Sequence, residues 1–209
     1  MEDKKQIIIF GGCFNPPLNS HFSLADQLLN EYQIIEKIVF MPVGDFYQNT
    51  EFYNKDTICN AEDRYNMLKI ECDKNEKFDV SRLEIDAEKQ LCTYETLQKM
   101  SELYPENQIC FLMGSDNLKE FEKWNSAEEL LTKYKVYLLA RDKDDINQII
   151  NESEFLSRHR ENLIIANDNI IGNISSTFVR RKIKEGKSVR YIVSDDVYDY
   201  IKDHNLYKG

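Results

Sequence analysis

Six short apolar runs alternate along the chain with segments whose apolar residues recur at helical spacing. Such runs are typical of buried strands, and a spacing of three to four residues is typical of amphipathic helices. Strands are expected over 6–10, 37–41, 78–83, 108–113, 135–140 and 162–166. Helices are expected from Asn19 or Ser20 to about Tyr32, over 60–72, 93–103, 117–121, 126–132, 145–158 and 175–184, and from Ser194 onward. This alternation predicts an α/β fold, a Rossmann-like doubly wound parallel sheet of five to six strands with helices on both faces.

The chain shows no internal repeat, low-complexity tract or Pro/Gly-rich linker over its 209 residues. We therefore expect a single domain over 1–209, with a helical C-terminal portion from about residue 175. Ligands of open α/β sheets bind at the carboxyl ends of the strands. The loops to consider are 11–21, 42–60, 84–93, 114–124 and 166–177.

Charge and cysteine usage narrow the classes of partner. The formal net charge is -10, which argues against a nucleic-acid partner. No apolar run approaches the roughly 20 residues of a membrane span, and five cysteines without a CxxC pair argue against a disulfide framework or a thiolate zinc site. We expect a cytoplasmic protein with no membrane partner and no metal-ligand cluster of its own. An acidic chain that binds a nucleotide must gather its cations locally.

Two glycines, Gly11 and Gly12, follow the first strand directly and let the backbone turn sharply or approach a ligand. A helix start comes next, where unpaired N–H groups suit phosphate, and His21 lies in its first turn. The loop is neither a GxGxxG fingerprint nor a P-loop. A plain strand-to-helix turn with His21 on the surface is the alternative.

A second group of polar residues lies near the C-terminus. Ser175, Ser176 and Thr177 stand at a helix start, where hydroxyls cap the helix or contact a polyphosphate. Six cations follow against Glu185 alone: Arg180, Arg181, Lys182, Lys184, Lys187 and Arg190. This is the local cation cluster that an acidic nucleotide-binding protein needs, although a simple serine cap and a solvated basic helix face are the alternatives.

The fourth expected strand ends at Gly114, where close approach of a ligand is permitted. Asp116 follows, and its carboxylate can accept from ribose hydroxyls. Trp124 offers a flat ring for a pyridine or purine, or it is a partly buried core aromatic.

Four motifs resemble, in order, those of the HxGH nucleotidyltransferases, and more narrowly of the nicotinate/nicotinamide mononucleotide adenylyltransferases. The segments are Gly11-Gly12-Cys13-Phe14-Asn15-Pro16 through His21, Thr93-Tyr94-Glu95-Thr96-Leu97, Gly114-Ser115-Asp116-Asn117-Leu118 with Phe121 and Trp124, and Ile174-Ser175-Ser176-Thr177-Phe178-Val179-Arg180. The resemblance implies transfer of AMP from ATP to a pyridine mononucleotide in NAD biosynthesis, with Mg²⁺ held mainly by ATP. The resemblance leaves open whether the chain forms a homo-oligomer.

The resemblance also implies roles for individual residues. His21 and Arg180 stabilise the phosphates as the catalytic residues. Thr93 and Trp124 frame the acceptor ring. The ATP and nucleotide site takes Gly11, Gly12, Cys13, Phe14, Gly114, Asp116, Ser175, Ser176, Thr177 and Arg180.

The first motif departs from the family pattern. Leu18 replaces its first histidine, Ser20 its glycine and Asn15 its aspartate, and the loop at 43–50 lacks the usual lysine, the nearest being Lys55. Leu91-Cys92 replaces the Ser-Tyr before the threonine of the second motif. We expect the site to work nonetheless, with His21, backbone amides and the basic 180–190 segment sharing the load. The alternatives are a different phosphorylated acceptor, such as phosphopantetheine, and a catalytically silent nucleotide-binding protein.

Overall fold

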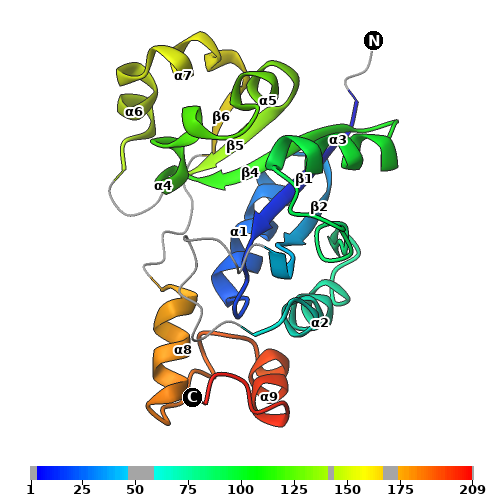
Figure 1. The fold of residues 1–209 in the computed structure, drawn as a ribbon, viewed down its shortest axis with the longest axis vertical. Helices are drawn as coiled ribbons and strands as arrows, with labels where there is room; N and C mark the ends of the chain where they lie inside the picture. The colour runs from blue at the N-terminus through cyan, green and yellow to red at the C-terminus, as the bar shows by residue number, and fades with distance from the viewer. Residues whose placement is uncertain (1–3, 47–58, 141–143, 167–173, 209) are drawn as a thin grey trace. The chain divides into compact units, whose positions relative to one another are not determined.

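The computed structural model describes residues 4–46, 59–140, 144–166 and 174–208 (Figure 1). Its strands are β1 (Gln6–Gly12), β2 (Ile35–Pro42), β3 (Phe78–Val80), β4 (Gln108–Gly114), β5 (Lys135–Leu139) and β6 (Leu163–Ala166). Its helices are α1 (Asn19–Glu31), α2 (Ala61–Cys72), α3 (Thr93–Leu103), α4 (Ser115–Leu118), η3 (Phe121–Lys123), α5 (Ala127–Lys133), α6 (Ile146–Glu152), α7 (Glu154–Arg158), η4 (Arg160–Asn162), α8 (Ser176–Lys184) and α9 (Asp195–Asp203). Most of the predicted loop 42–60, with Lys55, and residues 167–173 of the loop 166–177 lie outside the described ranges.

The strands form one six-stranded sheet in the order β3-β2-β1-β4-β5-β6. β4 pairs in parallel with β1 and with β5, and β5 pairs in parallel with β6. The register places Phe10 opposite Leu112, so the carboxyl ends of β1 and β4 lie at the same edge of the sheet. This order reverses direction between β1 and β4, which is the switch point of a doubly wound sheet. The predicted α/β Rossmann-like fold is confirmed.

The structure has α4 and η3 where one helix is expected over 117–121, and two other elements differ from their predicted bounds for local reasons. The helix predicted over 145–158 is two helices, α6 and α7, because Ser153 interrupts it and its hydroxyl caps α7 by accepting from the Leu156 amide. The strand predicted over 78–83 ends at Val80. The Leu83 amide there donates to the Ser81 hydroxyl at 3.2 Å, and such a local side-chain turn competes with the ladder.

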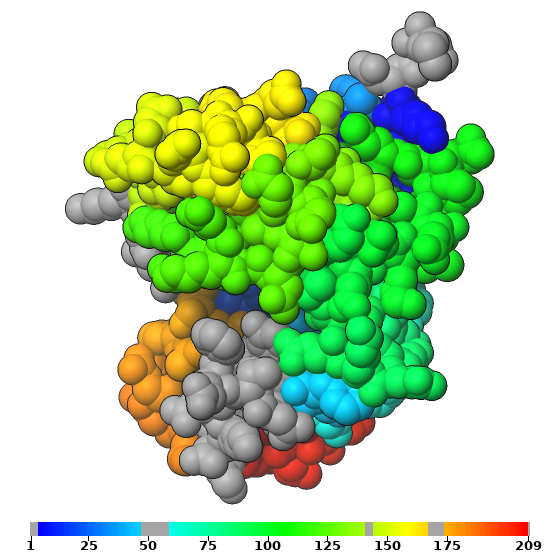
Figure 2. Space-filling view, turned by 45° about the horizontal axis from the view of Figure 1, so that its top comes forward, coloured from blue at the N-terminus to red at the C-terminus, as the bar shows by residue number. Residues whose placement is uncertain are grey.

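The contacts among Cα atoms divide the chain into two compact units. The first unit comprises Met1–Gly11, Gln27–Ile38 and Leu91–Asn173, and the second comprises Gly12–Asp26, Val39–Gln90 and Ile174–Gly209. In the first unit, Ile8, Leu112, Val136 and Leu138 are fully buried along the central strands. The segment from α6 to η4, yellow in Figure 2, forms a continuous outer surface.

The second unit has its own apolar core, which we call the C-terminal cluster: Leu18, Met67, Val179, Val189, Val193, Val197 and Ile201. The cluster joins α2, α8 and α9, and the helices predicted over 175–184 and from Ser194 onward are present as α8 and α9. The predicted caps are also present. The side chains of Asn60, Ser175 and Ser194 accept from the amides of Asp63, Phe178 and Val197.

Candidate active site

Gly11 and Gly12 end β1, and aromatic rings occupy the space where their Cβ atoms would stand. A Cβ on Gly11 would lie 3.2 Å from the Phe111 ring, and one on Gly12 would lie 3.1 Å from the Phe14 ring. Phe14 itself is buried with a positive φ of 49°, a backbone conformation that is strained for a phenylalanine. The glycines therefore serve ring packing, and their contact with a nucleotide stays a prediction.

The loop after β1 is held through its backbone carbonyls. Arg64 Nη1 donates to the Cys13 carbonyl at 3.1 Å, and Arg180 Nη1 donates to the Asn15 carbonyl at 2.8 Å. The Ser176 hydroxyl donates to the Pro16 carbonyl at 2.8 Å. Two guanidinium groups, one from α2 and one from α8, therefore fix the backbone on either side of Phe14.

Arg64 is a further residue of this site that the sequence motifs do not single out, and its side chain is 0% exposed. Its Nε also donates to the Cys59 carbonyl, and Asp45 lies 3.5 Å from Nη2. A signal was present, because Ala61, Arg64 and Leu68 share one helical face, the face that the structure buries. An arginine on this buried helical face indicates a guanidinium whose N–H groups donate to backbone carbonyls.

His21 is half-buried and takes part in the turn that starts α1. Its Nδ1 accepts from the Leu18 amide at 3.0 Å, and its own amide donates to the Leu18 carbonyl at 3.0 Å. The ring also meets Phe14 edge-on, with centroids 5.2 Å apart. Since Nδ1 accepts, the neutral ring carries its proton on Nε2. His21 therefore lies half-buried and forms part of the turn that starts α1, and its role toward a phosphate stays a prediction.

Two backbone amides at the start of α1 already have partners within the protein. The Leu18 amide is taken by His21, and the Asn19 amide donates to the Ile192 carbonyl at 3.0 Å. The prediction that unpaired N–H groups here suit phosphate is wrong for these two groups. Neither amide can compensate for the missing histidine at position 18 while these hydrogen bonds are kept.

Leu18 is 2% exposed and packs into the C-terminal cluster. We expect Leu18→His to lower the free energy of unfolding by about 3 kcal/mol, because an imidazole would be buried among apolar side chains that offer it no hydrogen bond. Leu18→Met is the control and should cost less than about 1.5 kcal/mol. Denaturant unfolding measures both. A Leu18→His protein as stable as wild type but with higher kcat would show that this side chain faces the nucleotide instead.

The hydroxyls at the start of α8 have separate tasks. Ser175 is exposed and caps the helix, Ser176 holds the Pro16 carbonyl, and Thr177 Oγ1 accepts from Arg180 Nη2 at 3.1 Å. The Nε–H of Arg180 is buried and has no hydrogen-bond partner among the described residues. A charged donor left in this way is costly, so among the described residues the Nε–H of Arg180 is a group that an anion would satisfy.

The basic segment after Arg180 is less available than the sequence implies. Arg181, Lys182 and Lys187 all pair with Glu185, and Lys187 and then Lys182 lower the pKa of that carboxyl to about 2. Arg190 pairs with Asp195 and Asp199 from α9. In the described part of the chain, only Arg180 and Lys184 of this segment lack a carboxylate partner. Most of the segment therefore matches the alternative of a solvated helix face.

The remaining candidates belong to the first unit. Gly114 ends β4 and Asp116 is exposed in the first turn of α4. Trp124 is half-buried against Phe121 and Phe111, with ring centroids 4.9 Å and 6.3 Å away. Thr93 opens α3, where Cys92 and Glu95 form a capping box. Trp124 is thus partly a core aromatic, and the ligand roles of these residues stay predictions.

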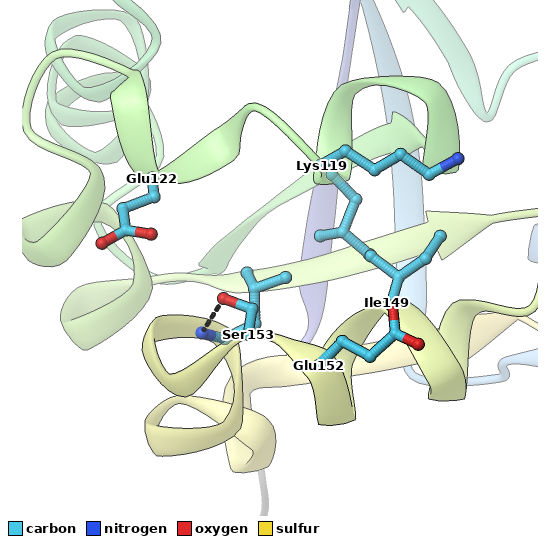
Figure 3. Close-up of a pocket in the computed structure, with 7 residues that line it drawn as sticks. Lys119, Glu122, Ile149, Glu152 and Ser153 are labelled. Atoms are coloured by element: carbon cyan, nitrogen blue, oxygen red, sulfur yellow. Dashed lines mark hydrogen bonds between the residues drawn. The ribbon is translucent and has the colours of Figure 1, made fainter.

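A pocket in the first unit contains none of the predicted residues. It is lined by Leu118, Lys119, Glu122, Ile149, Glu152, Ser153 and Leu156 (Figure 3). Its volume of about 200 Å³ is below the range of typical ligand sites. It presents two carboxylates against Lys119, which already pairs with Asp144 at 3.0 Å. These charges do not suit a polyphosphate.

The described residues include no group of three or more His, Cys, Asp or Glu side chains placed to hold a metal ion. Within those same ranges, no helix is both long and apolar enough to cross a membrane.

Comparison with known proteins finds relatives along the whole chain. The profile of the cytidylyltransferase-like family matches residues 9–182. A Caldicellulosiruptor bescii protein named "Probable nicotinate-nucleotide adenylyltransferase" is 35% identical over 204 residues, covering 97% of this chain and 99% of the relative. A Clostridium acetobutylicum protein of the same name is 32% identical, covering 97% of this chain and 99% of its own length.

A solved structure shares the fold. It is the Plasmodium falciparum nicotinic acid mononucleotide adenylyltransferase, in a complex with NaAD. It superposes with a TM-score of 0.76 at 21% identity, covering 98% of each chain.

Proposed function

This chain belongs to the cytidylyltransferase-like family of nucleotidyltransferases, and we propose that it transfers AMP from ATP to nicotinate mononucleotide or its amide counterpart. The products would be the dinucleotide and pyrophosphate. The observation that carries this proposal is Arg180, whose buried Nε–H has no partner among the described residues, while Nη1 holds the Asn15 carbonyl after β1 and Nη2 holds the Thr177 hydroxyl in α8. The names of the full-length relatives support the choice of acceptor.

The reaction needs no strong general base. A phosphate oxygen of the mononucleotide, already anionic near neutral pH, forms a bond to the α-phosphorus of ATP. The bond from that phosphorus to the oxygen bridging to the β-phosphorus breaks, and the electron pair leaves with pyrophosphate. Catalysis then depends on positioning and on stabilising charge. This fits a site that offers donors and no nucleophilic side chain.

We assign the charge stabilisation to two side chains of the second unit. Arg180 would bring its positive charge to the phosphates, and Nε–H is the donor left over when Nη1 and Nη2 are held by their protein partners. His21 would donate from Nε2, since its Nδ1 is held by the Leu18 amide. Asp116, Thr93 and Trp124 keep their proposed roles toward ribose and acceptor. Mg²⁺ remains an expectation, as a counter-ion carried by the phosphates of ATP.

The acceptor is tested with purified protein, ATP, Mg²⁺ and a panel of phosphorylated acceptors, following pyrophosphate release. We expect release with a pyridine mononucleotide and not with phosphopantetheine. Release with another acceptor alone would keep the transferase class and replace the acceptor. ATP binding without release from any acceptor would favour the silent nucleotide-binding protein instead.

A further inference from the structure

The side chain of Asn15 is a buried acceptor that three donors share. Its Oδ1 accepts from the Tyr207 hydroxyl at 2.7 Å, from the Cys59 amide at 3.3 Å and from the Cys59 thiol at 3.1 Å. Asn15 is 2% exposed, so these hydrogen bonds are shielded from water. Tyr207 follows Asn15 by 192 residues and is two residues from the end of the chain. The C-terminal end is therefore tied directly to the loop after β1.

The backbone of Asn15 also accepts a hydrogen bond, from Arg180. The Asn15 carbonyl accepts from Arg180 Nη1 at 2.8 Å, while the Asn15 side chain accepts from Tyr207. A shift of the Asn15 backbone would consequently move the guanidinium that it orients. The Ser176 hydroxyl holds the next carbonyl, so the position of α8 depends on the same short stretch of loop.

Tyr207 is suited to hold this stretch. Its packing against the C-terminal cluster holds the ring, and the Cys59 thiol lies 3.0 Å from its hydroxyl. Burial raises the pKa of Tyr207 well above its ordinary value, so the hydroxyl keeps its proton near neutral pH. Rigid support of this kind is what places a phosphate-binding group within a fraction of an ångström.

We propose that Tyr207 is a positioning residue of the nucleotide site, which acts through Asn15 to hold Arg180 in its phosphate-binding orientation. This inference rests on the proposed function, because it assigns to Arg180 the binding of ATP phosphates.

The test is Tyr207→Phe, which keeps the ring and removes the hydroxyl. Calorimetry with ATP and Mg²⁺ and steady-state kinetics at 25 °C should show Kd and KM for ATP raised on the order of 10-fold. The matched control is Tyr200→Phe, whose hydroxyl also has two side-chain partners in this unit, Asp63 at 2.9 Å and Asn66 at 3.2 Å. The control should lose a similar amount of stability and bind ATP as wild type does.

A double-mutant cycle with Arg180→Ala identifies the route of the effect. If Tyr207 acts through Arg180, adding Tyr207→Phe to Arg180→Ala should change ATP affinity less than twofold. An additive cycle would overturn the proposal, as would a Tyr207→Phe protein that loses stability but keeps wild-type Kd and KM. Failure of wild type to bind ATP would instead overturn the proposed function and this inference with it.

Discussion

Arg180→Ala is expected to lower kcat/KM for ATP on the order of 10³-fold. The substitution removes a buried guanidinium whose Nε–H has no partner among the described residues, and it releases the Asn15 carbonyl. One well-placed charged donor on a transferring phosphate is worth this much. Arg180→Lys should recover only part of the loss, because an ammonium cannot hold the carbonyl, the Thr177 hydroxyl and a phosphate in one plane.

Arg181→Ala is the matched control for this prediction. It removes the same charge from the next position of α8, where the side chain is 64% exposed and pairs with Glu185. Steady-state kinetics and calorimetry with ATP measure both variants. Equal losses in the two would mean that only the overall charge of the helix matters. Normal ATP affinity in Arg180→Ala would remove α8 from the site.

His21→Asn is expected to lower kcat by roughly 10²–10³-fold while leaving the fold close to wild-type stability. The amide oxygen of asparagine takes the place of Nδ1 and can still accept from the Leu18 amide, but no donor remains at the position of Nε2. The loss should therefore fall on the chemical step. Rapid kinetics and thermal unfolding separate the two effects.

His21→Gln is the counterpart variant, which should keep most of kcat and lose stability. Glutamine places a donor near the former Nε2 but leaves the Leu18 amide without its acceptor. We expect kcat nearer to that of wild type and stability lower by about 1 kcal/mol. Near-normal turnover in His21→Asn would contradict a role for His21 in charge stabilisation.

The fold was largely predictable because local signals agreed with one another. The apolar runs of β1, β4 and β5 and the caps at Asn60, Ser175 and Ser194 all lie where the sequence places them. The break at Ser153 was missed because a serine inside a polar helical stretch is common, and only its capping geometry separates α6 from α7.

The interior of the candidate site was less predictable. Nothing local reveals that Leu18 packs against helices more than 150 residues away, or that Asn15 accepts from Tyr207. The pairing of Arg190 with Asp195 and Asp199 is likewise not apparent from the sequence, because both aspartates lie beyond the basic segment 180–190. These contacts depend on how the last two helices pack, which a pattern along the chain does not contain.

The transfer itself is followed most directly with ATP labelled at the α-phosphate, supplied with Mg²⁺ and nicotinate mononucleotide. We expect the label to appear in a dinucleotide, with one pyrophosphate released for each labelled product and no product from Arg180→Ala on the same time scale. Label that stays in ATP while both nucleotides bind, or that moves only to an acceptor without a pyridine ring, would contradict the proposed transfer.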